Sequence, residues 1–378
     1  MKLAFVSNFM NHHQRPLSLA LAGHPDVDYR FIATEPFTGA GVSAGYRDMN
    51  REDPFILRPY ESEAAKAEAL AFCRAADVVI IGSAPDEYIE DRLRENKLTF
   101  RYCERFFKNG RWRILDPRVF LSRLSQHTRY RNKNLYMLCA SAYTAPDCRF
   151  IRAYPNKTYK WGYFPPVTQY KSIDAILQNK KKNSLLWVAR MIPLKHPEAP
   201  LEITKRLADD GYNFELNFIG QGELEEKIKT FIEENDLSDR VHLLGSMSPE
   251  EVRTHMEQSE IFLFTSDRNE GWGAVLNESM NSACAVVASR AIGSVPFLLH
   301  DRENGLVYED GDLDDLYEKV KYLLDHPTER TKMGKAAYRT LTETWNAESA
   351  AARLLKLIDA LQDGKDTPYT DGPCSRAE

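Results

Sequence analysis

Two glutamates after a short apolar run have the type and spacing to bind a phosphorylated sugar. Glu270 and Glu278 are separated by seven residues, and Gly271 and Gly273 follow the first of them. Bare glycine backbone at the start of a predicted helix leaves N–H groups facing the loop, which suits a phosphate. Because carboxylates repel phosphates, we expect the glutamates to bind neutral hydroxyls of a sugar and a ribose. The same residues also fit a solvated helix start with two surface carboxylates.

The flanking sequence predicts how these residues are held. Residues 261–265 form an apolar run typical of a buried strand, and residues 285–288 form another. Between them Val275, Leu276 and Met280 recur at helical spacing. The segment is therefore predicted to be a strand, a glycine loop, a helix and a further strand.

The paired glutamates resemble the donor-site signature of glycosyltransferase family 4, a retaining family with the GT-B fold. Five further segments match that family's motifs in order and at similar spacing. They are Leu186–Arg190 with Lys195, Phe218–Glu223, Val241–Gly245, Gly293–Pro296 and Glu303–Val307. Together the motifs cover about residues 184–310. Each motif is weak alone, whereas the ordered set is specific.

The resemblance implies an α/β fold in which two Rossmann-like, doubly wound parallel sheets face a cleft. Alternating strand and helix patterns along the chain independently favour parallel sheets. We expect an acceptor-binding domain at residues 1–170 and a nucleotide-sugar-binding domain at residues 171–345. A helix at 346–362 is expected to cross back to the first domain, and the polar tail 363–378 is expected to be disordered.

The resemblance also implies roles for single residues. Glu278 would bind the ribose, and Glu270 the transferred sugar. Arg190 and Lys195 would bind the diphosphate, for which a guanidinium fork and an ammonium are suited. We assign catalytic roles to Arg190, Lys195 and Glu270. The remaining predicted donor contacts are Gly220, Gly222, Leu244, Gly245, Gly271, Trp272, Gly273 and Ala274.

Acceptor contacts are predicted in the first domain. His12 and His13 follow the first predicted strand, where doubly wound sheets bind ligands; a purely structural role is the alternative. Many family 4 enzymes have a histidine after a later strand, but this chain has Glu104 and Arg105 there. We predict an acceptor-side role for both and a catalytic role, as a base, for Glu104, unless the strand is misaligned.

Other departures from the family lie near the donor motif. Ala283 and Ala285 stand where Gly and Pro are usual, and Phe297 where Glu is common. None removes a predicted phosphate or sugar contact, so we interpret them as packing changes in a divergent branch. We predict no metal ion and no cofactor, since Asp26-Val-Asp28 reads as a solvated turn and no His or Cys cluster has zinc spacing.

Length and composition bound the remaining possibilities. The 378 residues suffice for two domains. A net charge of −5 argues against a general nucleic-acid binder. Six scattered cysteines fit a reducing cytoplasm, and the start of the chain reads as a strand and not as a signal peptide. We expect a cytoplasmic protein that does not cross a membrane.

A basic segment lies between residues 91 and 133. It holds 13 Lys or Arg against 4 Asp or Glu, and aromatic residues such as Phe106, Trp112 and Phe120 are interleaved with them. This pattern fits an anionic membrane surface, with peripheral attachment at the inner face of the cell membrane. It fits single-stranded nucleic acid less well, given the resemblance. An ordinary solvated face is the third reading.

The predicted function is that of a retaining hexosyltransferase. The donor would be a nucleoside-diphosphate sugar, with UDP as the expected nucleotide, and the acceptor a glycan or a lipid-linked sugar for cell-surface polysaccharide or glycolipid synthesis. Two alternatives are a sugar-nucleotide epimerase with the same fold and a catalytically silent protein that binds nucleotide sugars. The altered stretch around Glu104 keeps the last alternative open.

Overall fold

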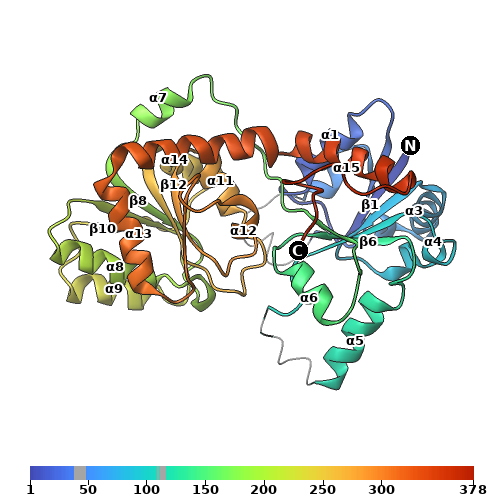
Figure 1. The fold of residues 1–378 in the computed structure, drawn as a ribbon, viewed down its shortest axis with the longest axis horizontal. Coiled ribbons are helices and arrows are strands. Elements are labelled where there is room, and N and C mark those ends of the chain that lie inside the picture. Colours follow the sequence, from blue (N-terminus) through green and yellow to red (C-terminus); the bar gives the residue numbers. More distant parts are fainter. Residues whose placement is uncertain (38–47, 109, 111–115) are drawn as a thin grey trace. The chain divides into compact units, whose positions relative to one another are not determined.

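A computed structural model describes residues 1–37, 48–108, 110 and 116–378. The chain divides into two compact units (Figure 1). Unit 1 comprises Met1–Pro166 and Asn346–Glu378, and unit 2 comprises Val167–Trp345. The boundary predicted at residue 170 thus falls at residue 166. Arg111, Trp112 and Arg113, which belong to the predicted basic segment, lie outside the described residues.

Unit 1 is built on a seven-stranded parallel sheet with the order β3-β2-β1-β4-β5-β6-β7. Its strands are β1 (Lys2–Ser7), β2 (Asp28–Ala33), β3 (Ile56–Leu57), β4 (Val78–Ile81), β5 (Thr99–Cys103), β6 (Leu135–Cys139) and β7 (Thr158–Lys160). Five of the seven are predicted from the apolar runs at residues 3–7, 29–34, 77–82, 98–103 and 135–140. The two edge strands β3 and β7 were missed because they have only two and three residues.

Helices and short 3₁₀ turns connect these strands. The helices are α1 (Arg15–Ala22), α3 (Glu63–Ala75), α4 (Glu90–Arg94), α5 (Pro117–Thr128), α6 (Thr144–Phe150) and α15 (Ala347–Gln362). The turns are η1 (Met49–Arg51), η2 (Pro59–Glu61) and η3 (Asp86–Tyr88). Central strands such as β4 are buried along their whole length, which explains their continuous apolar sequence.

Unit 2 has a six-stranded parallel sheet with the order β10-β9-β8-β11-β12-β13. The strands are β8 (Lys181–Val188), β9 (Glu215–Ile219), β10 (Val241–Leu243), β11 (Ser259–Phe264), β12 (Ala285–Ser289) and β13 (Leu306–Tyr308). The helical elements are α7 (Ile173–Gln178), η5 (Pro193–Lys195), α8 (Glu198–Asp209), α9 (Glu225–Glu234), α10 (Pro249–Gln258), α11 (Val275–Asn281), α12 (Val295–Leu298), α13 (Leu313–Asp325), α14 (Pro327–Arg339) and η6 (Thr340–Thr344).

Both sheets reverse their strand order at one point, which is where doubly wound folds bind ligands. In unit 1 the reversal lies between β1 and β4, and in unit 2 between β8 and β11. The carboxyl ends of these strands therefore mark the expected ligand sites of the two units.

The C-terminal segment belongs to unit 1. Helix α15 packs against α1 and leads into a tail that pairs with β7. Lys160 N–H donates to Ser375 O at 2.7 Å, and Ala377 N–H donates to Thr158 O at 3.1 Å. Cys374 is fully buried. The expected disorder of residues 363–378 is therefore corrected: backbone pairing with an otherwise open sheet edge orders a polar sequence.

Within the described residues, none of the helices has both the length and the apolar character that a membrane crossing requires.

Candidate functional site

Two loops at the switch point of unit 2 carry the predicted cationic pair. Arg190 follows β8, and Lys195 ends the turn η5. The end of β11 holds that turn in place, because the Thr265 hydroxyl hydrogen-bonds to the Lys195 carbonyl at 2.8 Å. The indole N–H of buried Trp187 donates to the same hydroxyl oxygen at 2.9 Å. The backbone of the Lys195 turn is thereby fixed to two neighbouring strands.

Lys195 and Glu270 form an ion pair. Their side chains are 16% and 14% exposed, so water screens the pair only in part. The Ser266 hydroxyl donates a second hydrogen bond to the same carboxylate oxygen at 3.1 Å. A ligand phosphate that binds Lys195 must therefore compete with Glu270 for the ammonium group.

Arg190 differs from Lys195 in being exposed. Among the described residues, no side chain or carbonyl forms a hydrogen bond or an ion pair with its guanidinium group. Its five N–H donors are therefore available to an anionic ligand.

At three predicted glycines a Cβ atom would clash with a neighbouring backbone or side chain. A Cβ atom at Gly220 would lie 1.9 Å from Ala189 O, and one at Gly222 would lie 2.4 Å from Met191 O. Gly273 has a φ of +79°, and a Cβ atom there would lie 2.3 Å from the Phe264 ring. The loop after β9 therefore lies against the loop after β8 more closely than a residue with a Cβ atom allows. The same holds for the loop before α11 and the Phe264 ring.

The remaining donor predictions fall on the same edge of the sheet. Leu244 N–H donates to Phe218 O at 2.9 Å, and Gly245 O accepts from Gly220 N–H at 2.8 Å. Glu278 lies in the first turn of α11, and burial raises the pKa of its carboxyl group against the opposing effect of Arg253. The removal of this carboxyl group from water therefore outweighs the attraction of the nearby Arg253.

The prediction for Trp272 needs a correction. Its side chain is fully buried, and the indole N–H donates to Asn277 Oδ1 at 2.9 Å. The ring also lies near the rings of Phe297 and Trp345, with centroids 6.4 and 6.0 Å away. The indole therefore belongs to the core of unit 2, and only the backbone of Trp272 remains for a donor contact.

Unit 1 has a polar pocket of about 340 Å³ at its own switch point. The pocket lies at the carboxyl ends of β1, β4 and β5, so the parallel sheet explains its position. Its lining residues are Ser7, Asn8, Phe9, Asn11, His13, Gln14, Ser83, Tyr102, Cys103, Glu104, Arg105, Lys108 and Tyr163. We call it the switch-point pocket.

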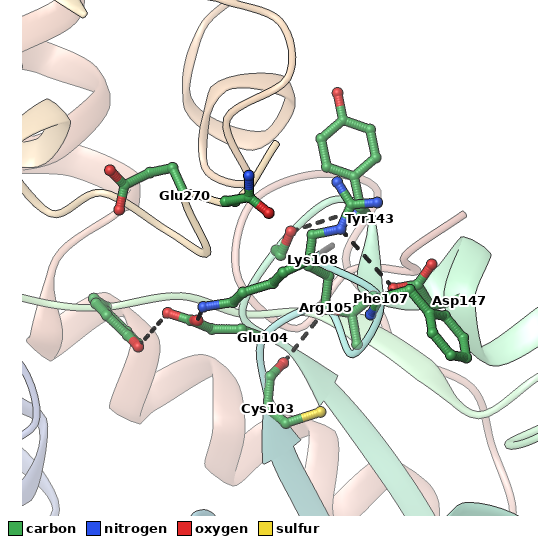
Figure 2. A network of polar contacts seen from close by, with 12 residues as sticks. Cys103, Glu104, Arg105, Phe107, Lys108, Tyr143, Asp147 and Glu270 are labelled. Carbon is green, nitrogen blue, oxygen red and sulfur yellow. Dashed lines mark hydrogen bonds and ion pairs between the residues drawn. The ribbon is translucent and has the colours of Figure 1, made fainter. Parts of the chain in front are cut away.

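Glu104 is the carboxylate of this pocket, and two neighbours fix it (Figure 2). The Tyr163 hydroxyl donates to Oε1 at 2.5 Å, and Lys108 forms an ion pair with Oε2. The side chain is 23% exposed, so it remains accessible to a ligand. Each oxygen keeps a further lone pair with which to accept a hydrogen bond from a ligand hydroxyl.

Arg105 lies beside Glu104 but turns to a different set of partners (Figure 2). Its guanidinium group lies 4.8 Å from the centre of the Tyr143 ring, and its Nε lies 4.0 Å from the carboxylate of buried Asp147. Asp147 also accepts from Phe107 N–H at 3.2 Å. Arg105 therefore anchors the loop after β5 while lining the switch-point pocket.

The two predicted histidines behave differently. His13 lines the switch-point pocket and stacks on Tyr163, with ring centroids 5.1 Å apart. Burial, with a smaller effect from His12, lowers the pKa of His13 to about 3. Its Nδ1 is buried without a hydrogen-bond partner among the described residues. His12 does not line the pocket, and burial lowers its pKa as well. Both imidazoles are therefore neutral near pH 7.

Sequence reasoning missed two residues that hold Glu104. Lys108 lies four positions after it, in a stretch interpreted as a basic surface, and Tyr163 lies in a segment interpreted as leading to the domain boundary. The i,i+4 spacing of Glu104 and Lys108 was an available signal, whereas the contact with Tyr163 depends on β7 joining the sheet. No group of three or more potential metal ligands occurs in the described part of the chain.

Comparison with known proteins identifies the domain that carries Arg190, Lys195, Glu270 and Glu278. The family model of glycosyl transferases group 1 matches residues 169–340, which is nearly all of unit 2. Unit 2 belongs to this family. The family prediction made from the motifs is thereby confirmed.

Curated relatives match about half of the chain. An uncharacterized glycosyltransferase of Methanocaldococcus jannaschii is 31% identical over 178 residues, which are 47% of this chain and 48% of the relative. The amylovoran biosynthesis glycosyltransferase AmsK of Erwinia amylovora is 28% identical over 207 residues, or 53% of this chain and 50% of the relative. The chain thus spans about half the length of these relatives.

Solved structures extend the likeness in fold to both units of the chain. Anabaena HepE in complex with UDP has a TM-score of 0.68 and 12% identity, covering 96% of this chain and all of HepE. HepE has also been solved with UDP and glucose. The predicted GT-B fold, with two Rossmann-like parallel-sheet domains, is confirmed.

Proposed function

We propose that the chain is a hexosyltransferase that uses a nucleoside-diphosphate sugar, with UDP as the nucleotide. One observation carries the proposal: Lys195 and Glu270 form an ion pair at the switch point of a group 1 glycosyltransferase domain, where the exposed Arg190 follows the adjoining strand β8. The UDP bound by HepE, a structural neighbour, supports the nucleotide. The name of AmsK supports a role in polysaccharide synthesis.

The transfer reaction needs positive charge beside the diphosphate of the donor, where the bond to the sugar breaks. As the glycosidic bond opens, negative charge grows on the departing diphosphate. Arg190 and Lys195 stabilise that charge more in the transition state than in the ground state, which lowers the barrier. When the donor phosphate binds Lys195, the ion pair between Lys195 and Glu270 breaks. The Glu270 carboxylate can then accept hydrogen bonds from the hydroxyls of the transferred sugar. Front-side attack with retention of configuration is the outcome we propose.

The acceptor side of the reaction is assigned to unit 1. The switch-point pocket offers hydroxyl, amide and imidazole groups, which suit the hydroxyls of a glycan. Glu104 would accept the hydrogen bond of the attacking hydroxyl and increase its nucleophilicity, while Tyr163 and Lys108 keep the carboxylate in position. The neutral, unpartnered His13 Nδ1 offers a further polar contact.

Binding of UDP tests the donor assignment. Because Arg190 and Lys195 already supply positive charge, we expect one UDP site whose dissociation constant does not change when a chelator removes divalent metal. Isothermal titration calorimetry with and without EDTA measures this. Loss of the binding heat in EDTA would contradict a site that works without metal.

We further propose that unit 1 docks on an anionic membrane surface near α5. Leu121 and Phe120 on this helix are 63% and 36% exposed, and Phe150 on α6 is 46% exposed. Arg118 on the same helix has a side chain that is 95% exposed. Exposed apolar groups beside cations are typical of a surface that lies on anionic lipid, where a lipid-linked acceptor would be found.

Sedimentation with vesicles tests this surface. We expect the protein to bind vesicles that contain anionic lipid and to be released by salt, because salt screens the attraction. Arg118→Ser should weaken the partition by about 1 kcal/mol, the usual contribution of one charge near such a surface. The matched control is Lys227→Ser, which changes an exposed lysine of unit 2. Equal binding to neutral vesicles, or none to either kind, would exclude the proposed surface.

A further inference from the structure

Unit 1 contains a second pocket, of about 320 Å³, further along the same edge of its sheet. Its lining residues are Thr34, Glu35, Pro59, Tyr60, Ser62, Glu63, Lys66, Pro85, Glu87 and Tyr88. They follow β2, β3 and β4, and they include the first turn of α3. We call it the distal pocket. None of the roles assigned above involves it.

The two pockets are neighbours through adjoining backbone. Thr34 N–H donates to Ser7 O at 2.8 Å, and Glu35 N–H donates to Asn8 O at 2.8 Å. The first residue of each pair lines the distal pocket, and the second lines the switch-point pocket. The segment after β4 also contributes to both, through Ser83 and Pro85. A chain-like ligand whose end occupies one pocket therefore needs to extend only a short way to reach the other.

The lining of the distal pocket selects against anions. Among the described residues, its lining includes three carboxylates and one cation, Lys66, which pairs with Glu87 at 3.1 Å. Phosphate or another carboxylate would be repelled there, whereas hydroxyl or amino groups can donate hydrogen bonds to the carboxylates. Two tyrosine rings and two prolines add apolar surface. This mixture of carboxylates and apolar faces matches a sugar ring.

Tyr88 supplies a hydrogen-bond donor at the wall of the distal pocket. It is only 4% exposed and lines the distal pocket, yet no described residue forms a hydrogen bond with its hydroxyl. The hydroxyl oxygen itself is not fully buried, so it reaches the open space of the pocket, where water or a ligand can be its partner. Burial, together with the nearby Glu87, raises the pKa of Tyr88 to about 12. The group therefore stays protonated and can donate to a ligand.

We propose that the distal pocket binds an internal sugar residue of an oligosaccharide acceptor, whose terminal sugar lies in the switch-point pocket. This proposal rests on the proposed function. It narrows the acceptor to a glycan of at least two sugar residues. The sugar residue in the distal pocket is uncharged or carries an amino group. Tyr88 donates a hydrogen bond to that residue, and the carboxylates of Glu35 and Glu63 accept from its hydroxyls.

The proposal is tested by varying the number of sugar residues in the acceptor and by removing the Tyr88 hydroxyl group. The probes are neutral oligosaccharides of one to four glucose, galactose or N-acetylglucosamine residues. Binding to the whole protein is measured by saturation-transfer NMR, and transfer by kcat/KM. We expect binding and kcat/KM to rise from one sugar residue to three in the wild type. For the three-residue acceptor, Tyr88→Phe should lower the affinity and kcat/KM roughly three- to tenfold, as for loss of one hydrogen bond. For the one-residue acceptor, both quantities should stay at their wild-type values.

Tyr136→Phe is the matched control, because it removes a tyrosine hydroxyl on β6, outside both pockets. Glu63→Gln is a second variant, whose exposed side chain carries little risk to folding. Equal length profiles for the wild type and both pocket variants, or no binding of any oligosaccharide, would overturn the proposal. UDP binding is measured on the same samples, so a failure of the donor assignment is seen separately. Tighter binding of a phosphorylated oligosaccharide than of its neutral form would also contradict the proposal.

Discussion

Lys195→Ala is expected to reduce kcat by about 30- to 1,000-fold, or about 2–4 kcal/mol, as for loss of one fixed donor to a developing charge. In the proposed mechanism, the ammonium group interacts most strongly with the diphosphate when the glycosidic bond is breaking. Its loss also leaves the Glu270 carboxylate without its ion-pair partner, beside the proposed phosphate site. Steady-state kinetics with varied donor concentration separates kcat from KM.

Lys205→Ala provides the control for this variant, since Lys205 is an exposed lysine on α8. Glu278→Gln is the comparison within the donor site, and it should mainly raise the donor KM, because charge on a ribose does not change during the reaction. Glu270→Ala should change both constants and the choice between epimeric donors. If Lys195→Ala altered only KM, or if Glu270→Ala stayed fully active, the proposed roles along these loops would be wrong.

Glu104→Gln is expected to reduce transfer to the acceptor by about 100-fold or more, the range for removing a group that takes part in proton transfer. The amide keeps the size of the side chain but loses one acceptor and the charge that faces Lys108. Donor hydrolysis by water and the affinity for UDP should stay near wild-type values, because Glu104 lies in unit 1 and the donor residues in unit 2. Parallel assays of transfer and hydrolysis measure the difference.

Tyr163→Phe should have a smaller effect, because it removes one hydrogen bond to Glu104 and leaves the ion pair with Lys108. Glu68→Gln, which changes an exposed glutamate on α3, controls for loss of charge alone. If Glu104→Gln reduced transfer and donor hydrolysis equally, the substitution would act through folding or donor binding, and the proposed role of Glu104 would be contradicted. Thermal melting separates those two.

The central strands and the positions of the motif glycines could be predicted because each leaves a short pattern in the sequence. Continuous apolar runs such as residues 78–81 are typical of strands buried on both faces. Gly220 and Gly222 were predicted from a motif, and the structure supplies the reason, which is close contact with the neighbouring backbone. The fold class also explains why β8 and β11, the strands that precede Arg190 and Glu270, are neighbours in the sheet.

Other features depend on contacts that no local pattern reveals. The Lys195–Glu270 pair joins residues 75 positions apart. The tail was expected to be disordered from its composition, but edge pairing with β7 orders it. Ala283 was interpreted as a packing change, whereas its φ of +54° places it in the left-handed region, where glycine is less strained. Tertiary hydrogen bonds and backbone conformation, not residue type, decided these cases.

Release of nucleotide in the absence of an acceptor distinguishes a glycosyltransferase from a silent binding protein. The purified chain is incubated in EDTA with UDP-, GDP- and ADP-sugars, and free nucleotide is measured over time. We predict slow release of UDP from one UDP-sugar, and its loss in Lys195→Ala. Binding of UDP-sugars without release, or release of nothing from any donor, would contradict the proposed transfer.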